Sequence, residues 1–215
     1  PDSRLAEVEV HVARVRMGER LAREAPVEAD AVMPIPDSGT PAAIGYARAS
    51  GIPFLEGLIK NRYVGRTFIQ PDQALRERGI KVKFNPLAEI AGQRVVVVDD
   101  SIVRGTTTKQ IVAVLFEAGA LEVHVRVSSP PIVSPCFYGI DMADQADLVA
   151  AGRETDDVRA HIGATSLAYL SLEGLQQATR QPAERFCRAC LTGEYPTEIP
   201  YGLRLQKLRF EAART

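Results

Sequence analysis

The sequence has too few cysteines for a disulfide-stabilised domain and lacks a hydrophobic run long enough to cross a membrane. Its 215 residues include only Cys136, Cys187 and Cys190. An odd number of thiols, with no secretory leader, argues against a self-contained disulfide framework and favours the reducing cytoplasm. No apolar segment approaches the length of a transmembrane helix, so no membrane partner is expected.

An excess of charge of one sign is also lacking. The formal net charge is -1, so no strong electrostatic field steers the molecule towards nucleic acid. Hydrophobic residues make up 46% and charged residues 25% of the chain, which are ordinary values for a globular protein. The length fits one large domain, or one domain with an extension.

Two glycine motifs that bind nucleotides are missing. The Gly-x-x-x-x-Gly-Lys-Ser/Thr loop and the Gly-x-Gly-x-x-Gly fingerprint do not occur. We find no helix-turn-helix segment either, which leaves no sequence support for DNA binding. The function has to be sought in another pattern.

Hydrophobic periodicity predicts alternating strands and helices, as in an α/β protein with a mainly parallel sheet. The clearest strand is Arg94–Asp99, because four consecutive valines make both of its faces apolar. A helix at Lys109–Glu117 and a strand at Leu121–Val127 complete a βαβ unit. The other expected elements are helices at 3–25, 41–50, 155–162 and 171–179, strands at 30–35, 52–59 and 81–84, and a long excursion over 60–80.

The segment Val95–Thr108, VVVVDDSIVRGTTT, carries the chemistry. Asp99 and Asp100 end a buried strand, at the edge of the sheet where open α/β proteins bind ligands. A glycine and three threonines precede a helix, whose first N–H groups suit an anion. Adjacent carboxylates can bind a sugar diol or a hard divalent cation. The alternative from shape alone is a helix-capping turn with two solvated acids.

This segment resembles the signature of the type I phosphoribosyltransferases. Four further segments narrow the resemblance to the glutamine-dependent amidophosphoribosyltransferases. They are Pro34–Gly39 (PIPDSG), Lys60–Ile69 (KNRYVGRTFI), Ser128–Pro131 (SSPP) and Phe137–Asp141 (FYGID). The resemblance implies the type I fold, a mainly parallel sheet flanked by helices with an irregular, partly helical C-terminal extension. It implies an enzyme of purine synthesis that displaces pyrophosphate from 5-phosphoribosyl 1-diphosphate with ammonia, taken from glutamine, to give 5-phosphoribosylamine.

The resemblance also implies roles for individual residues. Asp99 and Asp100 would face the ribose hydroxyls and Mg²⁺, with Ser38 as a third magnesium-associated position. The pyrophosphate would lie on Asp37, Ser38 and Gly39. The 5-phosphate would lie in the loop formed by Gly105, Thr106, Thr107 and Thr108, and Ser101 would also belong to the substrate-binding residues. Lys60, Arg62 and Arg66 would belong to a loop that closes over the substrate, although exposed cations commonly serve solubility alone.

The sequence allows several interpretations of the cysteines. A CxxC pair, Cys187 and Cys190, is by itself compatible with redox chemistry, zinc or chance. The resemblance implies that Cys136, Cys187 and Cys190 are three ligands of a [4Fe-4S] cluster, with the fourth expected upstream of Pro1. Thiols without a metal are the alternative.

The resemblance divides the chain into a phosphoribosyltransferase domain, residues 1–180 with a helical lead-in over 1–29, and a C-terminal extension, residues 181–215. An N-terminal glutaminase domain is not part of the sequence. Purine nucleotides are implied as feedback inhibitors, and a homo-oligomer as the assembly. A base-salvage or orotate phosphoribosyltransferase, and a non-catalytic sensor of the ribose diphosphate, stay open as alternatives.

Overall fold

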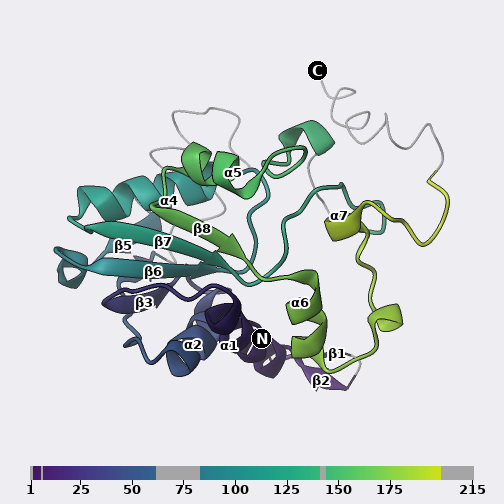
Figure 1. Cartoon of the computed structure of the whole chain (residues 1–215), viewed down its shortest axis with the longest axis horizontal. Helices are drawn as coiled ribbons and strands as arrows, with labels where there is room; N and C mark the ends of the chain where they lie inside the picture. Colours follow the sequence, from purple (N-terminus) through teal and green to yellow (C-terminus); the bar gives the residue numbers. More distant parts are fainter. Residues whose placement is uncertain (1, 6, 62–82, 141–143, 200–215) are drawn as a thin grey trace.

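The central feature of the fold is a four-stranded parallel sheet (Figure 1). A computed structural model describes residues 2–5, 7–61, 83–140 and 144–199. The sheet has the order β3-β6-β7-β8, and every neighbouring pair of strands in it is parallel. Its strands are β3 (Ala31–Pro34), β6 (Arg94–Asp99), β7 (Glu122–Val127) and β8 (Ser166–Tyr169).

Helices cover both faces of this sheet. In Figure 1, α4 (Thr106–Glu117) and α5 (Thr155–Ile162) lie above it, and α1 (Val10–Glu24) and α2 (Thr40–Ser50) lie below it. Strand β6 supplies side chains to both sides, because successive residues of a strand point to opposite faces. Val95 and Val97 belong to the core beneath α4, whereas Val96 and Val98 belong to the core with Tyr46 of α2. The α/β fold with a parallel sheet flanked by helices is confirmed.

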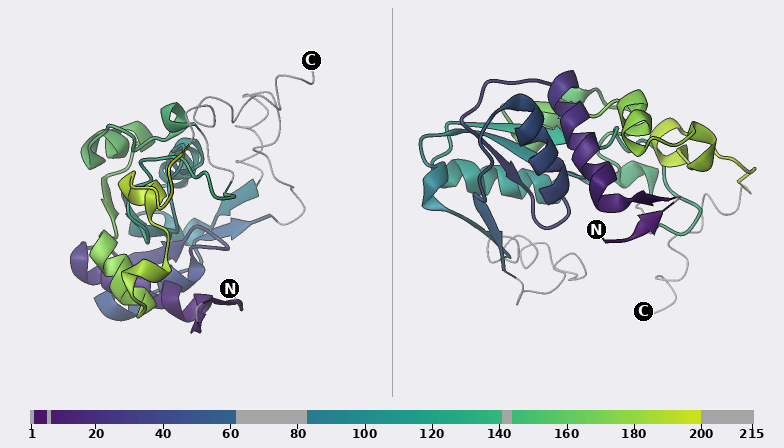
Figure 2. Two further views of the ribbon diagram at one scale, coloured as in Figure 1. Left: turned by 90° about the vertical axis from the view of Figure 1, so that its right-hand side faces the viewer. Right: turned by 90° about the horizontal axis from the view of Figure 1, so that it is seen from below.

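Helices α1 and α2 cross at very short range (Figure 2). A β-carbon added to Gly18 of α1 would lie 1.8 Å from the carbonyl oxygen of Ala42. One added to Gly45 of α2 would lie 1.9 Å from the carbonyl oxygen of Val15. The two backbones are therefore in direct contact, and only glycine fits at either position. This contact fixes α1 relative to the chain that leads into α2.

Several sequence expectations need correction. The helix expected at 3–25 begins only at Val10, because the residues before it form an antiparallel hairpin of β1 (Arg4–Leu5) and β2 (Val8–Glu9). The strand expected at 52–59 is wrong: Phe54 makes a single bridge to Val32. The strand of this region is β4 (Leu58–Lys60), antiparallel to β5 (Phe84–Pro86).

Other differences from the sequence expectations concern where α4 and β5 begin, and one strand that was not expected. Helix α4 begins at Thr106, three residues before the expected start, and β5 begins where the strand expected at 81–84 was to end. Residues 81 and 82 lie outside the described residues. Strand β8 was not expected. The helices expected at 155–162 and 171–179 are present as α5 and α6 (Leu172–Thr179).

Two polar side chains of β7 are buried against the α1 side of the sheet. His124 and Arg126 are each only 4% exposed. Ring nitrogens of His124 lie 2.9 Å from the hydroxyl of Ser166 and 2.8 Å from a carboxylate oxygen of Glu122. Arg126 donates to the carbonyl of Ala25, at the end of α1, over 3.0 Å. His124 is thus a buried residue of the strand.

The remaining helical segments of the described chain are short, namely η2 (Ala88–Ile90), η3 (Gln145–Asp147), η4 (Ala183–Arg185) and α7 (Ala189–Thr192). Within the described ranges, no helix is long and apolar enough to cross a bilayer.

Candidate functional site

The first part of the candidate site is the turn between β3 and α2. Ile35 donates from its N–H to the carbonyl of Val98 over 2.8 Å, which ties the start of the turn to the end of β6. Gly39 sits against the same strand, since a β-carbon there would lie 2.5 Å from the oxygen of Val98. Asp37 and Ser38 are exposed at the tip. The Pro36–Asp37 peptide bond is cis.

The acid pair lies directly beside this turn, at the carboxyl end of β6. The register pairs Pro34 of β3 with Val98, the residue before Asp99. The N–H of Asp100 donates to the Asp99 carboxylate over 2.8 Å, and the Ser101 hydroxyl donates to that of Asp100 over 3.2 Å. Both the N–H and the hydroxyl of Ser128 donate to the Asp99 carbonyl, over 2.9 and 3.1 Å.

The environment of Asp99 favours a cation. Burial, and after it the charge of Asp100, raises the pKa of the Asp99 carboxyl group to about 7. Two neighbouring carboxylates that disfavour each other's charge are stabilised by a bound cation. Carboxylate oxygens are ligands that Mg²⁺ accepts, so the residues present fit this ion.

The third part is the loop that leads into α4. Gly105 precedes the helix with a φ of 75°, a conformation that glycine adopts without strain. The loop is anchored by a 2.8 Å hydrogen bond from the N–H of Val149 to the carbonyl of Val103. Thr106 and Thr107 are exposed at the first turn, where helical N–H groups lack intrahelical acceptors. The Thr108 side chain is only 4% exposed, so it packs inside and offers the site little beyond its backbone.

Two cationic side chains from different elements contact the turn. The Lys60 ammonium at the end of β4 lies 2.7 Å from a carboxylate oxygen of Asp37. Arg14 of α1 donates to the carbonyl of Ser38 over 3.2 Å. Arg62 and Arg66 of the expected closing loop lie outside the described residues. Arg14 was missed from the sequence, since it lies on a helix 24 residues before Ser38 and only the helix crossing brings the two together.

The cysteines form a separate group. Cys136 and Cys190 pack against one apolar cluster with Ile132 and Leu148. The carbonyl of Cys190 accepts from the N–H groups of Val133 and Ser134, over 2.9 and 3.1 Å, which joins the two segments.

The thiols influence one another. Burial, and after it the proximity of Cys136, raises the pKa of Cys190, and Cys187 adds a smaller effect. Among residues 2–5, 7–61, 83–140 and 144–199, no three His, Cys, Asp or Glu side chains are grouped closely enough to hold one metal ion.

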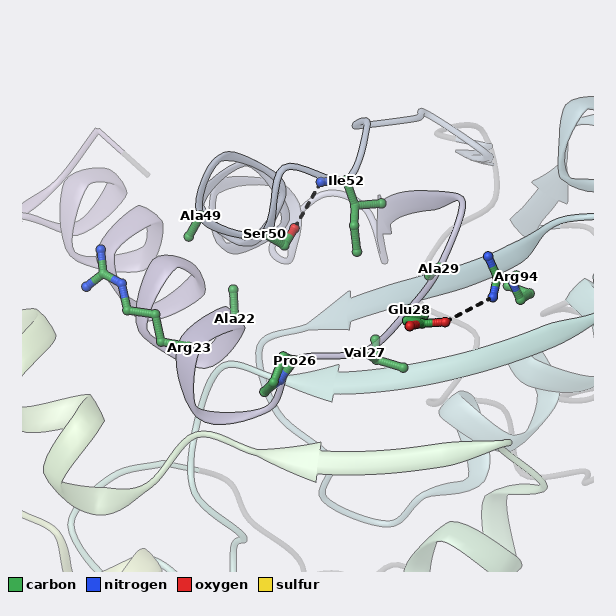
Figure 3. Close-up of a pocket in the computed structure, with 10 residues that line it drawn as sticks. All are labelled: Ala22, Arg23, Pro26, Val27, Glu28, Ala29, Ala49, Ser50, Ile52 and Arg94. Atoms are coloured by element: carbon green, nitrogen blue, oxygen red, sulfur yellow. Dashed lines mark hydrogen bonds and ion pairs between the residues drawn. The ribbon is translucent and has the colours of Figure 1, made fainter.

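A large open groove lies away from this site (Figure 3). It has a volume of about 710 Å³ and is lined by residues such as Val27, Ile52 and Arg94. Arg94 begins β6, so the groove is at the amino ends of the strands, opposite the acid pair. The candidate site itself is an exposed edge formed by loops.

Relatives of the chain share its sequence over nearly its full length. An amidophosphoribosyltransferase of Synechocystis is 54% identical over 212 residues, which is 98% of this chain and 43% of that protein. The amidophosphoribosyltransferase of Mycobacterium tuberculosis is 55% identical over 213 residues, 96% of this chain and 40% of that protein. The chain thus spans less than half the length of these relatives.

A solved structure agrees with the sequence. The chain matches the glutamine phosphoribosylpyrophosphate amidotransferase of Bacillus subtilis, complexed with ADP and GMP, with a TM-score of 0.85 at 54% identity. The match covers 94% of this chain and 45% of that one. The phosphoribosyl transferase domain family matches residues 9–129, which include the turn, the acid pair and the loop before α4. The chain therefore belongs to the phosphoribosyl transferase domain family.

Proposed function

We propose that this chain displaces pyrophosphate from 5-phosphoribosyl 1-diphosphate with ammonia to form 5-phosphoribosylamine, as an amidophosphoribosyltransferase of purine synthesis. The observation that carries the proposal is the convergence of three anion- and cation-binding parts at one sheet edge. The Asp37–Gly39 turn, the Asp99–Asp100 pair and the start of α4 at Gly105 meet at the ends of β3 and β6. The identity of 54–55% to amidophosphoribosyltransferases supports this reaction over base salvage or sensing.

Each part takes one portion of the substrate. The N–H groups at the start of α4 and the exposed Thr106 and Thr107 hold the 5-phosphate, because a helix amino terminus attracts anions. Asp99 and Asp100 accept hydrogen bonds from the ribose hydroxyls. The Asp37–Gly39 turn receives the pyrophosphate.

The reaction requires that the charge of the leaving pyrophosphate is neutralised. It also requires a nitrogen nucleophile with a free lone pair, which ammonia has and ammonium lacks. Asp99 and Asp100, with Ser38, would hold Mg²⁺, which would supply positive charge to the pyrophosphate. Lys60 adds an ammonium group at the turn, and Arg62 and Arg66 are proposed to add guanidinium groups. Ammonia attacks the anomeric carbon as the bond to pyrophosphate breaks, and the amine formed then loses a proton to water. The protein needs no general base for this step.

The nitrogen source gives the test. The 215-residue polypeptide is expected to release pyrophosphate from the ribose diphosphate with Mg²⁺ and high ammonium. The rate should rise with pH through the alkaline range, because only unprotonated ammonia is a nucleophile. Glutamine should not replace ammonium, since its hydrolysis needs an activated nucleophile with an oxyanion site, which the resemblance assigns to a separate domain. Pyrophosphate release measured with both nitrogen sources, with and without Mg²⁺, checks this expectation. A folded chain that binds the diphosphate but releases nothing with ammonium would contradict the proposal.

The cysteine group is proposed to hold a [4Fe-4S] cluster. Cys136, Cys187 and Cys190 come from two segments that are joined by hydrogen bonds. Apolar side chains surround Cys136 and Cys190, and such surroundings suit an iron–sulfur cluster that is shielded from water. A four-iron cluster is larger than a single ion, so its ligand sulfurs stand further apart. Four thiolates are needed, and the fourth is assigned to a residue upstream of Pro1.

The cluster has a spectroscopic test. Protein purified without oxygen, in a form that extends upstream of Pro1, is expected to show visible iron–sulfur absorbance. Cys187→Ser should abolish it because one ligand is lost, whereas Ser134→Ala beside the group should retain it. Zinc in place of iron in the anaerobic protein would refute the assignment.

The remaining proposals concern regulation and organisation. The Bacillus subtilis relative is described in complex with ADP and GMP, which supports purine nucleotides as feedback inhibitors of this chain. We also propose a homo-oligomer in the cytoplasm. Residues 1–180 are proposed as the transferase domain and 181–215 as an extension.

A further inference from the structure

One charged side chain near the site has no part in the reaction proposed above. Arg14 projects from the second turn of α1 towards the tip of the turn between β3 and α2. Its guanidinium donates to the carbonyl oxygen of Ser38 over 3.2 Å. This inference rests on the proposed function, which places pyrophosphate on that turn.

The contact fixes one peptide plane at both of its ends. The peptide group between Ser38 and Gly39 carries the Ser38 carbonyl and the Gly39 N–H. Arg14 binds the carbonyl, and the Gly39 N–H donates to the carbonyl of Ile35 over 3.1 Å. Gly39 also lies against β6, close to the oxygen of Val98. The plane therefore has a single orientation, with the carbonyl turned towards α1.

That orientation matters for an anion. A carbonyl oxygen carries negative partial charge and repels a phosphate group, whereas an N–H attracts one. Gly39 and Thr40 use their N–H groups inside the turn, bonding to Ile35 and Asp37. Within the described residues the N–H of Ser38 has no acceptor, so it is the group of this turn left for a ligand.

Arg14 can act in this way because α1 cannot move relative to the turn. The backbone of α1 contacts that of α2 at Gly18 and Gly45, and α2 begins one residue after Gly39. Gly18 lies one helical turn beyond Arg14 on the same helix. The crossing therefore fixes the starting point of the Arg14 side chain.

We propose that Arg14 is a positioning residue for pyrophosphate binding, which acts by holding the Ser38–Gly39 peptide with its carbonyl turned away from the anion. The proposal assigns Arg14 no contact with the ribose or with the 5-phosphate.

The test separates the two ends of the substrate. Calorimetry of the full chain with Mg²⁺ should show that Arg14→Ala weakens pyrophosphate binding about tenfold, as expected for loss of one charge-assisted hydrogen bond. Binding of ribose 5-phosphate, which uses the loop before α4, should stay unchanged. Arg14→Lys, which retains a charged donor, should recover part of the affinity. Arg16→Ala, on another face of the same helix, is the matched control and should bind both ligands normally.

Hydrogen exchange gives a readout independent of binding. In Arg14→Ala, exchange of the Gly39 amide should become faster, while amides of residues 109–117 in α4 keep their wild-type rates. Equal losses of pyrophosphate and ribose 5-phosphate affinity, or unchanged exchange at Gly39, would overturn the proposal for Arg14. Wild-type protein that binds neither ligand would instead overturn the proposed function, and the inference with it.

Discussion

Replacing both Asp99 and Asp100 by asparagine is expected to lower Mg²⁺-dependent affinity for 5-phosphoribosyl 1-diphosphate by about a hundredfold or more. Each lost charge-assisted contact costs roughly 1.5–3 kcal/mol, and two are lost together. The amides keep the shape of the side chains but remove both charges beside the proposed metal. Isothermal calorimetry with the diphosphate, at fixed Mg²⁺, measures the change.

The control for this double substitution is the same change at an aspartate outside the site. Asp156 is exposed on α5 and pairs with Arg159 over 2.6 Å, so Asp156→Asn should leave binding intact. The double variant should fold at least as well as wild type, because Asp99 is half-buried beside a like charge and its pKa is raised to about 7. Unchanged affinity in a folded double variant would remove the acid pair from the site.

The second large effect is expected at the helix crossing. Gly45→Ala would stabilise an ordinary exposed helix by about 1 kcal/mol, because alanine has the higher helix propensity. Here we expect destabilisation by roughly 1–3 kcal/mol, since the new β-carbon would lie 1.9 Å from the backbone oxygen of Val15. Urea unfolding followed by circular dichroism measures the shift in midpoint. Whether Gly45→Ala raises or lowers the free energy of unfolding therefore tests whether the backbones of α1 and α2 are in direct contact.

A matched variant on the same helix separates propensity from contact. Ala49 is exposed near the end of α2, so Ala49→Gly should lose no more than about 1 kcal/mol, from propensity alone. A Gly45→Ala protein that is more stable than wild type would show that α1 and α2 do not touch as described.

The sequence predicts the centre of the fold well because its signals there are local. Four consecutive valines identify β6, and the acids, glycine and threonines that follow it identify the loop that leads into α4, although the helix begins at Thr106 and not at Lys109 as expected. Short and interrupted segments are harder to predict from the sequence. Pro53 and Gly57 divide the apolar run at 52–59, so it makes one bridge in place of a strand. Strand β8 has only four residues, too few for a clear alternation.

The site could be predicted only where its residues are neighbours in the chain. The acid pair and the turn at Asp37–Gly39 each form a contiguous motif. The contact between Arg14 and Ser38 depends on the angle and distance of two helices, and the glycines that set them resemble any helix glycine in sequence. Similarly, Ser128 reaches Asp99 only because β7 pairs with β6.

Because β3 pairs with β6 at the site, a bound ligand is expected to stabilise the folded protein. The turn after β3 and the acids after β6 are about 60 residues apart in sequence, and only the Pro34–Val98 register brings them together. A molecule that touches both binds the paired strands and has no site on the unfolded chain. It therefore acts as a reversible cross-link, and at a concentration 100 times its Kd it should raise the free energy of unfolding by about 2.7 kcal/mol. Because opening this pair of strands also breaks the site, protease resistance should follow ligand concentration across the whole sheet.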